Sequence, residues 1–284
     1  MASGNDGLWW VGSPAVNPPV ALTVAGSDSA GGAGLQADLR TFAALGVFGT
    51  SVVTAVTAQN TQSVLGIERI DPPFVDLQLE AVLGDLPVAA VKTGMLASSA
   101  TIVALSRWAS AHRLPNLVVD PVLVASTGKP LLDAAAVDSY RESLFPHAAA
   151  ITPNLHEAAL LTGMAIGDVD DMATAARLLG DTGATMVVVK GGHLGGKTAP
   201  DVVVTGGKLT VLEARRVVTT NDHGTGCTLS AALAARLAIG DSLLEAMATA
   251  KRYVGDALAG AAAWRLGRGH GPLDHFGWGA RAVR

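Results

Sequence analysis

The chain has a single cysteine, Cys227, among its 284 residues, so it cannot form an internal disulfide. This scarcity fits a reducing compartment, and we expect the protein to be cytoplasmic. Charged residues make up only 15% of the chain, and their net charge is −4, without a long run of one sign. This balance argues against nucleic acid as the main partner.

No segment of the sequence reads as a membrane span or a secretory leader. The stretch 41–67 carries no charge, but its glycine, glutamine and asparagine residues indicate a helix end, a turn, a strand and a loop. Residues 1–19 lack a basic start followed by an apolar core, and we expect a loosely ordered extension there. No linker or internal repeat divides the remainder, so we expect one domain over 20–284.

Short apolar runs alternate with helical patterns along most of the chain. The runs are nearly continuous, as in strands that are covered on both faces. This alternation predicts a parallel sheet between two layers of helices, which is an α/β fold. The predicted strands span 20–25, 51–57, 88–91, 117–119, 148–151 and 186–189, and the predicted helices span 34–45, 74–83, 98–112, 134–144, 155–161, 171–179, 225–238 and 243–263.

A hairpin is predicted to interrupt the alternation. Residues 202–204 and 209–212 read as strands, and Thr205-Gly206-Gly207-Lys208 between them reads as the turn. Residues 215–218 are expected to add an edge strand.

Polar and glycine-rich residues follow the predicted parallel strands on one side. Ligands of such sheets bind at the carboxyl ends of the strands, so this clustering indicates an enzyme. The clustered segments are 26–28, 59–60, 92–95, 120–121, 152–154 and 190–192.

Two phosphate-binding patterns are rejected. Residues 191–198 match the P-loop pattern, but Pro200 and a β-branched run follow where the P-loop needs a helix. Residues 32–37 fit a loose dinucleotide pattern, but Gln59 and Asn60 stand where the acidic residue belongs. We expect the first segment to be a flexible glycine loop, and the glycines of the second to let a loop approach a small ligand. The candidate lids are the Gly31-Gly32 pair and the loop from Gly191 to Gly196.

The segment Asp222-His223-Gly224-Thr225-Gly226-Cys227-Thr228 opens an Ala- and Leu-rich helix. Backbone N–H groups at a helix start, together with the helix dipole, favour an anion. The same dipole is expected to lower the pKa of the Cys227 thiol. A phosphate cradle beside a proton acceptor suits phosphoryl transfer to an alcohol. A plain turn beside a buried thiol would explain the same residues.

Several motifs together resemble the hydroxymethylpyrimidine/phosphomethylpyrimidine kinases of thiamine synthesis, and the likeness runs from about Val20 to Phe276. Each motif is unspecific alone, but their order and spacing agree. The motifs are Ala25-Gly26-Ser27-Asp28-Ser29, Thr57-Ala58-Gln59-Asn60-Thr61, Lys92-Thr93-Gly94-Met95-Leu96, Thr152-Pro153-Asn154-Leu155-His156-Glu157, Lys190-Gly191-Gly192-His193, His223 to Cys227, and Gly267-Arg268-Gly269-His270-Gly271-Pro272.

This resemblance implies a ribokinase-like three-layer α/β/α sandwich that is usually homodimeric. It implies Mg-ATP as the phosphoryl donor. It also implies two successive reactions, in which 4-amino-5-hydroxymethyl-2-methylpyrimidine is converted to its monophosphate and then to its diphosphate.

The resemblance assigns roles at the phosphate end of the site. It makes Cys227 the catalytic base, and we expect the amides of Gly224, Thr225, Gly226 and Cys227 to hold the phosphoryl group. It places Asp120 and Glu157 near magnesium, and Asn154 and Lys190 near the ATP phosphates. Each has a structural alternative: an Asp-Pro turn for Asp120, a capping box for Asn154 and Glu157, and an ion pair for Lys190.

The resemblance also places residues around the pyrimidine. Gln59 is expected to pair with the aminopyrimidine edge, because its amide both donates and accepts; a hydrogen bond within its loop is the alternative. The other pocket residues are Gly26, Asp38, Met95 and Val122. Asp38 would otherwise be a solvated acid and Met95 plain core. His223 is expected to be a hydrogen-bonded structural residue, and the scattered histidines lack the spacing of a zinc site.

Two other functions remain open from the sequence. A pyridoxine or pyridoxal kinase would keep the fold and change the substrate, and Lys190 marks this ambiguity because similar pyridoxal kinases use a lysine there on an aldehyde. A non-catalytic vitamin-binding protein is the third hypothesis. The joint presence of Asp120, Glu157, Lys190 and Cys227 argues against it.

Overall fold

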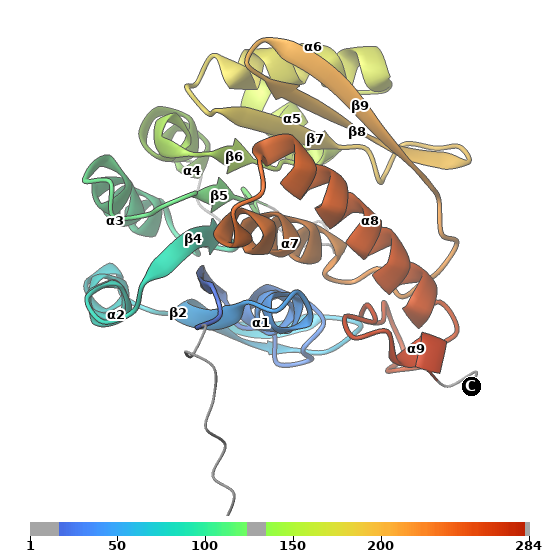
Figure 1. Cartoon of the computed structure of the whole chain (residues 1–284), viewed down its shortest axis with the longest axis horizontal. Helices are drawn as coiled ribbons and strands as arrows, with labels where there is room; N and C mark the ends of the chain where they lie inside the picture. Colours follow the sequence, from blue (N-terminus) through green and yellow to red (C-terminus); the bar gives the residue numbers. More distant parts are fainter. Residues whose placement is uncertain (1–16, 124–134, 282–284) are drawn as a thin grey trace, which may run out of the picture.

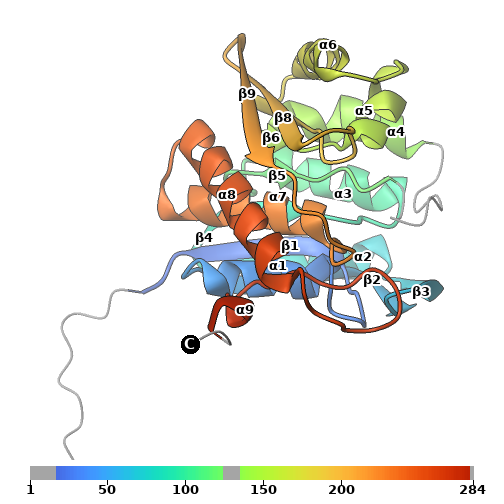
Figure 2. The same cartoon turned by 90° about the vertical axis from the view of Figure 1, so that its right-hand side faces the viewer.

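A computed structural model describes residues 17–123 and 135–281. Of the expected extension 1–19, residues 1–16 therefore lie outside the described residues. A nine-stranded sheet runs through the described part, in the order β3-β2-β1-β4-β5-β6-β7-β8-β9 (Figures 1 and 2). Six neighbouring strands are parallel: β1 (Val20–Gly26), β2 (Phe48–Gln59), β4 (Val88–Thr93), β5 (Val118–Val119), β6 (Ala150–Ile151) and β7 (Met186–Lys190).

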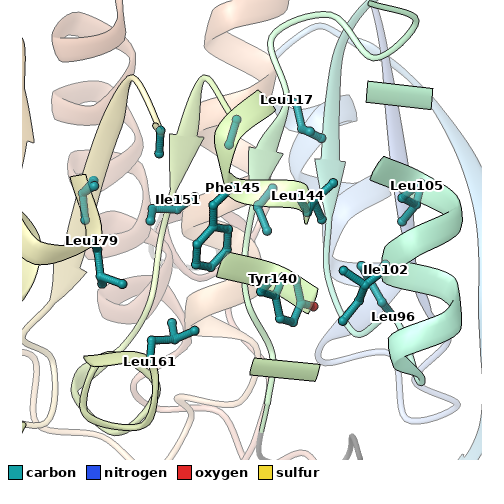
Figure 3. Packing of buried hydrophobic residues seen from close by; sticks show 14 of the residues in the cluster. Leu96, Ile102, Leu105, Leu117, Tyr140, Leu144, Phe145, Ile151, Leu161 and Leu179 are labelled. Carbon is teal, nitrogen blue, oxygen red and sulfur yellow. The ribbon is translucent and has the colours of Figure 1, made fainter. Parts of the chain in front are cut away.

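Helices cover both faces of this sheet and bury one apolar cluster against each (Figure 1). The expected three-layer α/β sandwich is confirmed, and Figure 3 shows the larger cluster around Tyr140 and Phe145. On that face lie α2 (Pro72–Leu83), α3 (Ser99–Ser110), α4 (Ala136–Asp138), α5 (Leu155–Thr162) and α6 (Val169–Gly180). On the other face lie α1 (Gly34–Ala44), α7 (Thr225–Ile239) and α8 (Leu243–Ala261), and the short α9 (Trp278–Arg281) follows near α8.

The antiparallel part of the sheet is larger than predicted at one edge and smaller at the other. The strand β3 (Val64–Arg69) pairs antiparallel with β2 where a loop was expected. It was missed because its side chains are mostly exposed, so no apolar run marks it. The predicted hairpin is confirmed as β8 (Thr198–Thr205) and β9 (Lys208–Arg215).

The edge strand expected over 215–218 is absent, because β9 ends at Arg215. The guanidinium of Arg216 instead donates to backbone carbonyls of the 191–198 loop, at 3.0 Å to Gly196 and 2.6 Å to Gly192. Thr198 then begins β8 directly, so no helix follows the P-loop-like segment and its rejection is confirmed.

The predicted helix 134–144 is also different. Ala134 lies outside the described residues, and α4 passes into a π-helical turn over Ser139–Leu144 and a 3-10 turn over Phe145–His147. A π-turn widens the helix by one residue per hydrogen bond, which a 3.6-residue apolar pattern does not reveal. Among the described helices none is long and apolar enough to cross a membrane.

A buried histidine contacts the first turn of α7. The Nε2 atom of His275 lies 3.0 Å from the hydroxyl of Thr228, in the first turn of that helix. Burial, and after it the charge of Arg40, lowers the pKa of His275 to about 4. The imidazole is therefore neutral at pH 7, and protonating it requires the fold to bury a charge.

This histidine predicts acid sensitivity. Because the folded-state pKa is lowered, its stabilising contribution is present above about pH 6.5 and is lost as the pH falls towards 4. Between pH 7 and 4.5 the free energy of unfolding should fall by about 2–3 kcal/mol more in the wild type than in His275→Gln. Urea unfolding at both pH values measures this difference, and equal losses would contradict a neutral buried His275.

Candidate active site

The start of α7 presents backbone amides beside the ends of β1, β5 and β7. Gly224 is the N-cap with φ 86°, and no side chain caps the helix. A β-carbon at Gly224 would collide with the carbonyl of Gly32, so only glycine fits this loop-to-loop contact. The first helical bond runs from the amide of Thr228 to the carbonyl of Gly224 at 2.8 Å.

All four predicted amide donors precede the amide of Thr228, which makes that first helical bond. The amides of Gly226 and Cys227 stand in the first turn of α7, where a helix supplies them with no acceptor. The amide of Thr225 instead donates to the carbonyl of Asp222 at 3.2 Å. An anion at this helix start is thus met first by Gly226 and Cys227.

An ion pair between Lys190 and Asp120 lies against the same turn. Lys190 ends β7, Asp120 follows β5, and the Nζ–Oδ1 distance is 2.7 Å. A β-carbon built at Gly226 would lie 3.2 Å from the lysine nitrogen and 3.8 Å from the Oδ2 atom of Asp120. Thr152 and Ser230 each donate to this carboxylate at 3.2 Å. Burial opposes ionisation of Asp120, but Lys190 and Lys92 lower its pKa on balance.

The expected capping box is present at the start of α5. The Asn154 side chain accepts the amide of Glu157 at 2.9 Å, and the Glu157 carboxylate accepts the amide of Asn154 at 2.8 Å. Glu157 is only 3% exposed. Burial raises its pKa to about 7, against the opposing charge of Lys190, and Asp120 raises it further. The structural alternative holds for both residues, and it leaves Glu157 as a buried acid whose cationic neighbour, Lys190, is paired with Asp120.

The thiol of Cys227 differs from the sequence-based expectation. It occupies the third position of α7 and is half-buried. Burial raises its pKa to about 11; Lys92 opposes this rise, whereas Asp38 and Asp120 add to it. The expected lowering of the thiol pKa is therefore wrong, because desolvation and the charges of Asp38 and Asp120 outweigh the charge of Lys92 and the hydrogen bond from Gly34. In the ligand-free protein the thiol is protonated at neutral pH.

A second lysine–carboxylate pair lies fully inside the molecule. Lys92 lies within β4, and its Nζ contacts the two carboxylate oxygens of Asp38 at 2.8 and 3.0 Å. Thr23 donates to the same carboxylate at 2.6 Å, and Lys92 and Asp38 have no exposed surface. Asp38 is therefore not a solvated helix acid, and its oxygens are already occupied. A charge at the end of an apolar run could have identified Lys92, as it identifies Lys190.

The other predicted pocket residues make three contacts. A β-carbon at Gly26 would collide with the methyl group of Met95, so these two residues touch. Val122 is half-buried, and its amide donates to the carbonyl of Asp120 at 2.9 Å. The side chain of Gln59 lies 3.3 Å from the ring of His223, which confirms His223 as a hydrogen-bonded residue.

No preformed metal cluster appears in the parts of the chain that the structure describes. Within 17–123 and 135–281, no three histidine, cysteine or acidic side chains are grouped to hold an ion. Asp120 and Glu157 are two carboxylates, and magnesium typically takes one or two together with waters and substrate phosphates. Their donor set fits a magnesium ion that arrives with a nucleotide.

Comparisons with known proteins agree on one family. A family model described as phosphomethylpyrimidine kinase matches residues 28–274. A hydroxymethylpyrimidine/phosphomethylpyrimidine kinase of Rhizobium meliloti is 51% identical over 258 residues, covering 90% of this chain and 97% of that protein. A thiamine biosynthesis bifunctional protein of Geobacter sulfurreducens is 50% identical over 255 residues, covering 90% of this chain and 52% of its own length.

A solved structure supports the ribokinase-like architecture. The pyridoxal kinase of Bacillus subtilis, solved as an ADP complex, superposes with a TM-score of 0.84 at 36% identity. The superposition covers 92% of this chain and 99% of that one. Two substrate classes are therefore represented among proteins that resemble this chain.

The buried pair predicts a large stability effect. Lys92→Met leaves Asp38 charged and unpaired, and should lower the free energy of unfolding by about 3–5 kcal/mol. The double variant Lys92→Met/Asp38→Leu should recover most of this loss. Arg107→Met removes the exposed pair with Asp76 and serves as the control, expected to cost less than about 1 kcal/mol. Denaturant unfolding measures all three, and a stable Lys92→Met protein would refute the unpaired-charge argument.

The raised thiol pKa predicts slow alkylation. Cys227 is the only cysteine, so the iodoacetamide adduct followed by mass spectrometry reports on this group alone. Because the thiolate reacts, the rate should increase about tenfold per pH unit from 7 to 10 and level off only near 11. A rate that levels off below pH 8 would show that the dipole outweighs burial.

Proposed function

The chain belongs to the phosphomethylpyrimidine kinase family, and we propose that its transfer site is the first turn of α7 with Lys190 and Asp120. The chain uses ATP to phosphorylate 4-amino-5-hydroxymethyl-2-methylpyrimidine and then its monophosphate, in thiamine biosynthesis. One observation carries the assignment of the site. The ion pair of Lys190 and Asp120, at 2.7 Å, lies against the amide-bearing turn, where a β-carbon added at Gly226 would lie 3.2 Å from the lysine nitrogen.

In this proposal the turn and the lysine hold the transferred phosphoryl group. The amides of Gly226 and Cys227 and the α7 dipole point at developing negative charge. Lys190 holds this charge as a protonated ammonium group, because Asp120 and Glu157 raise its pKa although burial favours the neutral amine. Gly224 and Thr225 shape the turn, and Gly224 also lets the 31–32 loop pack against it.

Cys227 is the proposed acceptor of the proton from the alcohol. Its half-buried thiol must first release its proton to solvent before it can act, and Lys92 favours that loss electrostatically. A thiolate with so high a pKa is a strong base towards an alcohol. Serine or alanine in its place would keep the turn and remove this acceptor.

We propose that Asp120 and Glu157 would hold magnesium, and that Asn154 would lie near the ATP phosphates. The raised pKa of Glu157 supports this assignment, because it indicates a buried acid that lacks a full positive partner. When bound, magnesium would neutralise phosphate charge. Gly26, Met95, Gln59 and Val122 line the proposed pyrimidine pocket, whereas buried Asp38 supports the pocket through Lys92.

The alternative substrate is pyridoxal, and the similarity to the Bacillus subtilis enzyme favours it. Attack on an aldehyde requires an unprotonated lysine. Lys190 is held in an ion pair at 2.7 Å and its pKa is raised, so it is unsuited to that reaction. The aminopyrimidine alcohol is therefore the preferred substrate.

We also propose that residues 20–284 form one domain, and that the protein is a cytoplasmic homodimer. The shared nine-stranded sheet supports the single domain. The single cysteine supports the compartment. Exposed apolar side chains on β2, β3 and α2 support self-association: Phe48, Val56, Leu65, Phe74 and Leu77.

Two matched lysines test the transfer site. Lys251 pairs with Asp201 at 2.7 Å with burial similar to that of Lys190, but on β8 and α8. Lys190→Met should lower kcat/KM for the aminopyrimidine alcohol by about 100-fold or more, because it removes a donor to the phosphoryl group. Lys251→Met should lose stability and keep its activity per folded molecule.

Steady-state kinetics with Mg-ATP and either alcohol decide between the substrates. Equal losses in the two lysine variants would show that Lys190 acts only as a structural ion pair. A wild-type preference for pyridoxal would overturn the choice of substrate.

A further inference from the structure

Asp28 ties together three segments at the carboxyl end of β1. Its carboxylate accepts hydrogen bonds from the backbone amides of Ala30 at 2.9 Å, Gly32 at 3.1 Å and Ala33 at 2.9 Å. Its Oδ2 atom lies 2.9 Å from the Nε2 atom of His223. Burial opposes ionisation of Asp28, but His223 and the loop amides lower its pKa. A carboxylate that accepts four such contacts is ionised.

Gln59 approaches the same imidazole nitrogen. Its side-chain Nε2 atom lies 3.3 Å from the Nε2 atom of His223. The backbone of Gln59 is fixed as well, since its amide donates to the Ser29 hydroxyl at 2.8 Å and its carbonyl accepts from that hydroxyl at 2.9 Å. The amide group therefore extends from an anchored position, and only its own rotation is free.

Counting protons settles which amide atom faces the histidine. The Nε2 atom of His223 faces an ionised carboxylate at 2.9 Å, so it must carry a hydrogen. A second N–H donor at 3.3 Å then has nothing to donate to. Rotating the amide by 180° exchanges the nitrogen and oxygen, which are distinguished only by their hydrogen-bond network. The Gln59 oxygen can share the one Nε2 hydrogen with Asp28, as the longer arm of a three-centre hydrogen bond, whereas the amide nitrogen could not.

We infer that Asp28 and His223 orient the Gln59 amide, with its Oε1 atom against the imidazole and its N–H2 group available to a ligand. Asp28 and His223 are thus positioning residues, because they act on a ligand only through the orientation of the Gln59 amide. The neutral Nε2–H tautomer and the imidazolium both carry the required hydrogen, so the orientation is the same in either state.

This orientation deepens the proposed function and, for its consequence, rests on it. If Gln59 lines the pyrimidine pocket, its N–H2 group donates to a ring nitrogen, and the second lone pair of Oε1 accepts from an exocyclic amine. The aminopyrimidine edge offers both partners side by side. Specificity at this position then depends on two residues that need not touch the substrate.

NMR on the full-length, ligand-free protein measures directly which ring nitrogen of His223 carries a proton. Histidine labelled with ¹⁵N, with His223→Gln to assign its signal, reports which ring nitrogen is protonated. A protonated Nε2 of His223 between pH 6 and 8 is expected. An unprotonated Nε2 would overturn the inference, because the amide nitrogen would then be the correct donor.

Two substitutions of Gln59 supply a second test at pH 6. Gln59→Glu keeps an oxygen that accepts from His223, so its melting temperature should equal or exceed that of the wild type. Gln59→Leu removes the acceptor and should melt about 2–4 °C lower. His270→Gln breaks the exposed pair with Asp222, 2.6 Å apart, and is the matched control with no expected shift. Equal losses in Gln59→Glu and Gln59→Leu would contradict the orientation.

Kinetics test the consequence separately. Gln59→Glu retains the acceptor and loses the donor, so KM for the aminopyrimidine alcohol should increase about tenfold with little change in kcat. An unchanged KM would show that the N–H2 group does not meet the substrate. If the wild type fails to phosphorylate this alcohol, the proposed function fails, while the NMR and melting results still decide the orientation.

Discussion

The ion pair between Lys190 and Asp120 joins the ends of β7 and β5 directly beside the start of α7. Each strand is fixed by its neighbours in the parallel sheet, so the two charges are held without a flexible loop between them. The first turn of α7, which bears the backbone amides, lies against this ion pair. A site built on rigid strand ends needs little reorganisation when negative charge develops, which is the property that electrostatic catalysis requires. The glycines at 224 and 226 matter because they allow this close approach.

The electrostatics of the site depend on two lysines with different surroundings. Lys190 is slightly exposed, and in the proposed function it exchanges Asp120 for a phosphate oxygen, whereas Lys92 is buried in the core with Asp38 and Thr23. Lys92 offsets the burial of the Cys227 thiol without contacting a ligand. The balance keeps the thiol protonated in the resting protein. The same thiol becomes a strong base only after it has lost its proton.

Periodicity and local rules predicted much of the fold. Continuous apolar runs located the parallel strands, Asn154 and Glu157 gave a capping box three residues apart, and Pro200 correctly excluded a P-loop helix. The exposed edge strand β3 and the π-turn after α4 carry no such signal. The clustering of Lys190 and Asp120 at one end of the sheet followed from parallel topology. The thiol pKa, the burial of Asp38 and the contact between Asp28 and His223 did not, because they depend on packing between segments far apart in the chain.

The central claim is that the terminal phosphate of ATP binds at the first turn of α7. A crystal structure with a non-hydrolysable ATP analogue, magnesium and the aminopyrimidine alcohol tests it most directly. We expect phosphate oxygens within about 3 Å of the amides of Gly226 and Cys227 and of the Lys190 ammonium group. A terminal phosphate bound instead in the 191–198 glycine loop, with the Lys190–Asp120 pair intact, would contradict this claim.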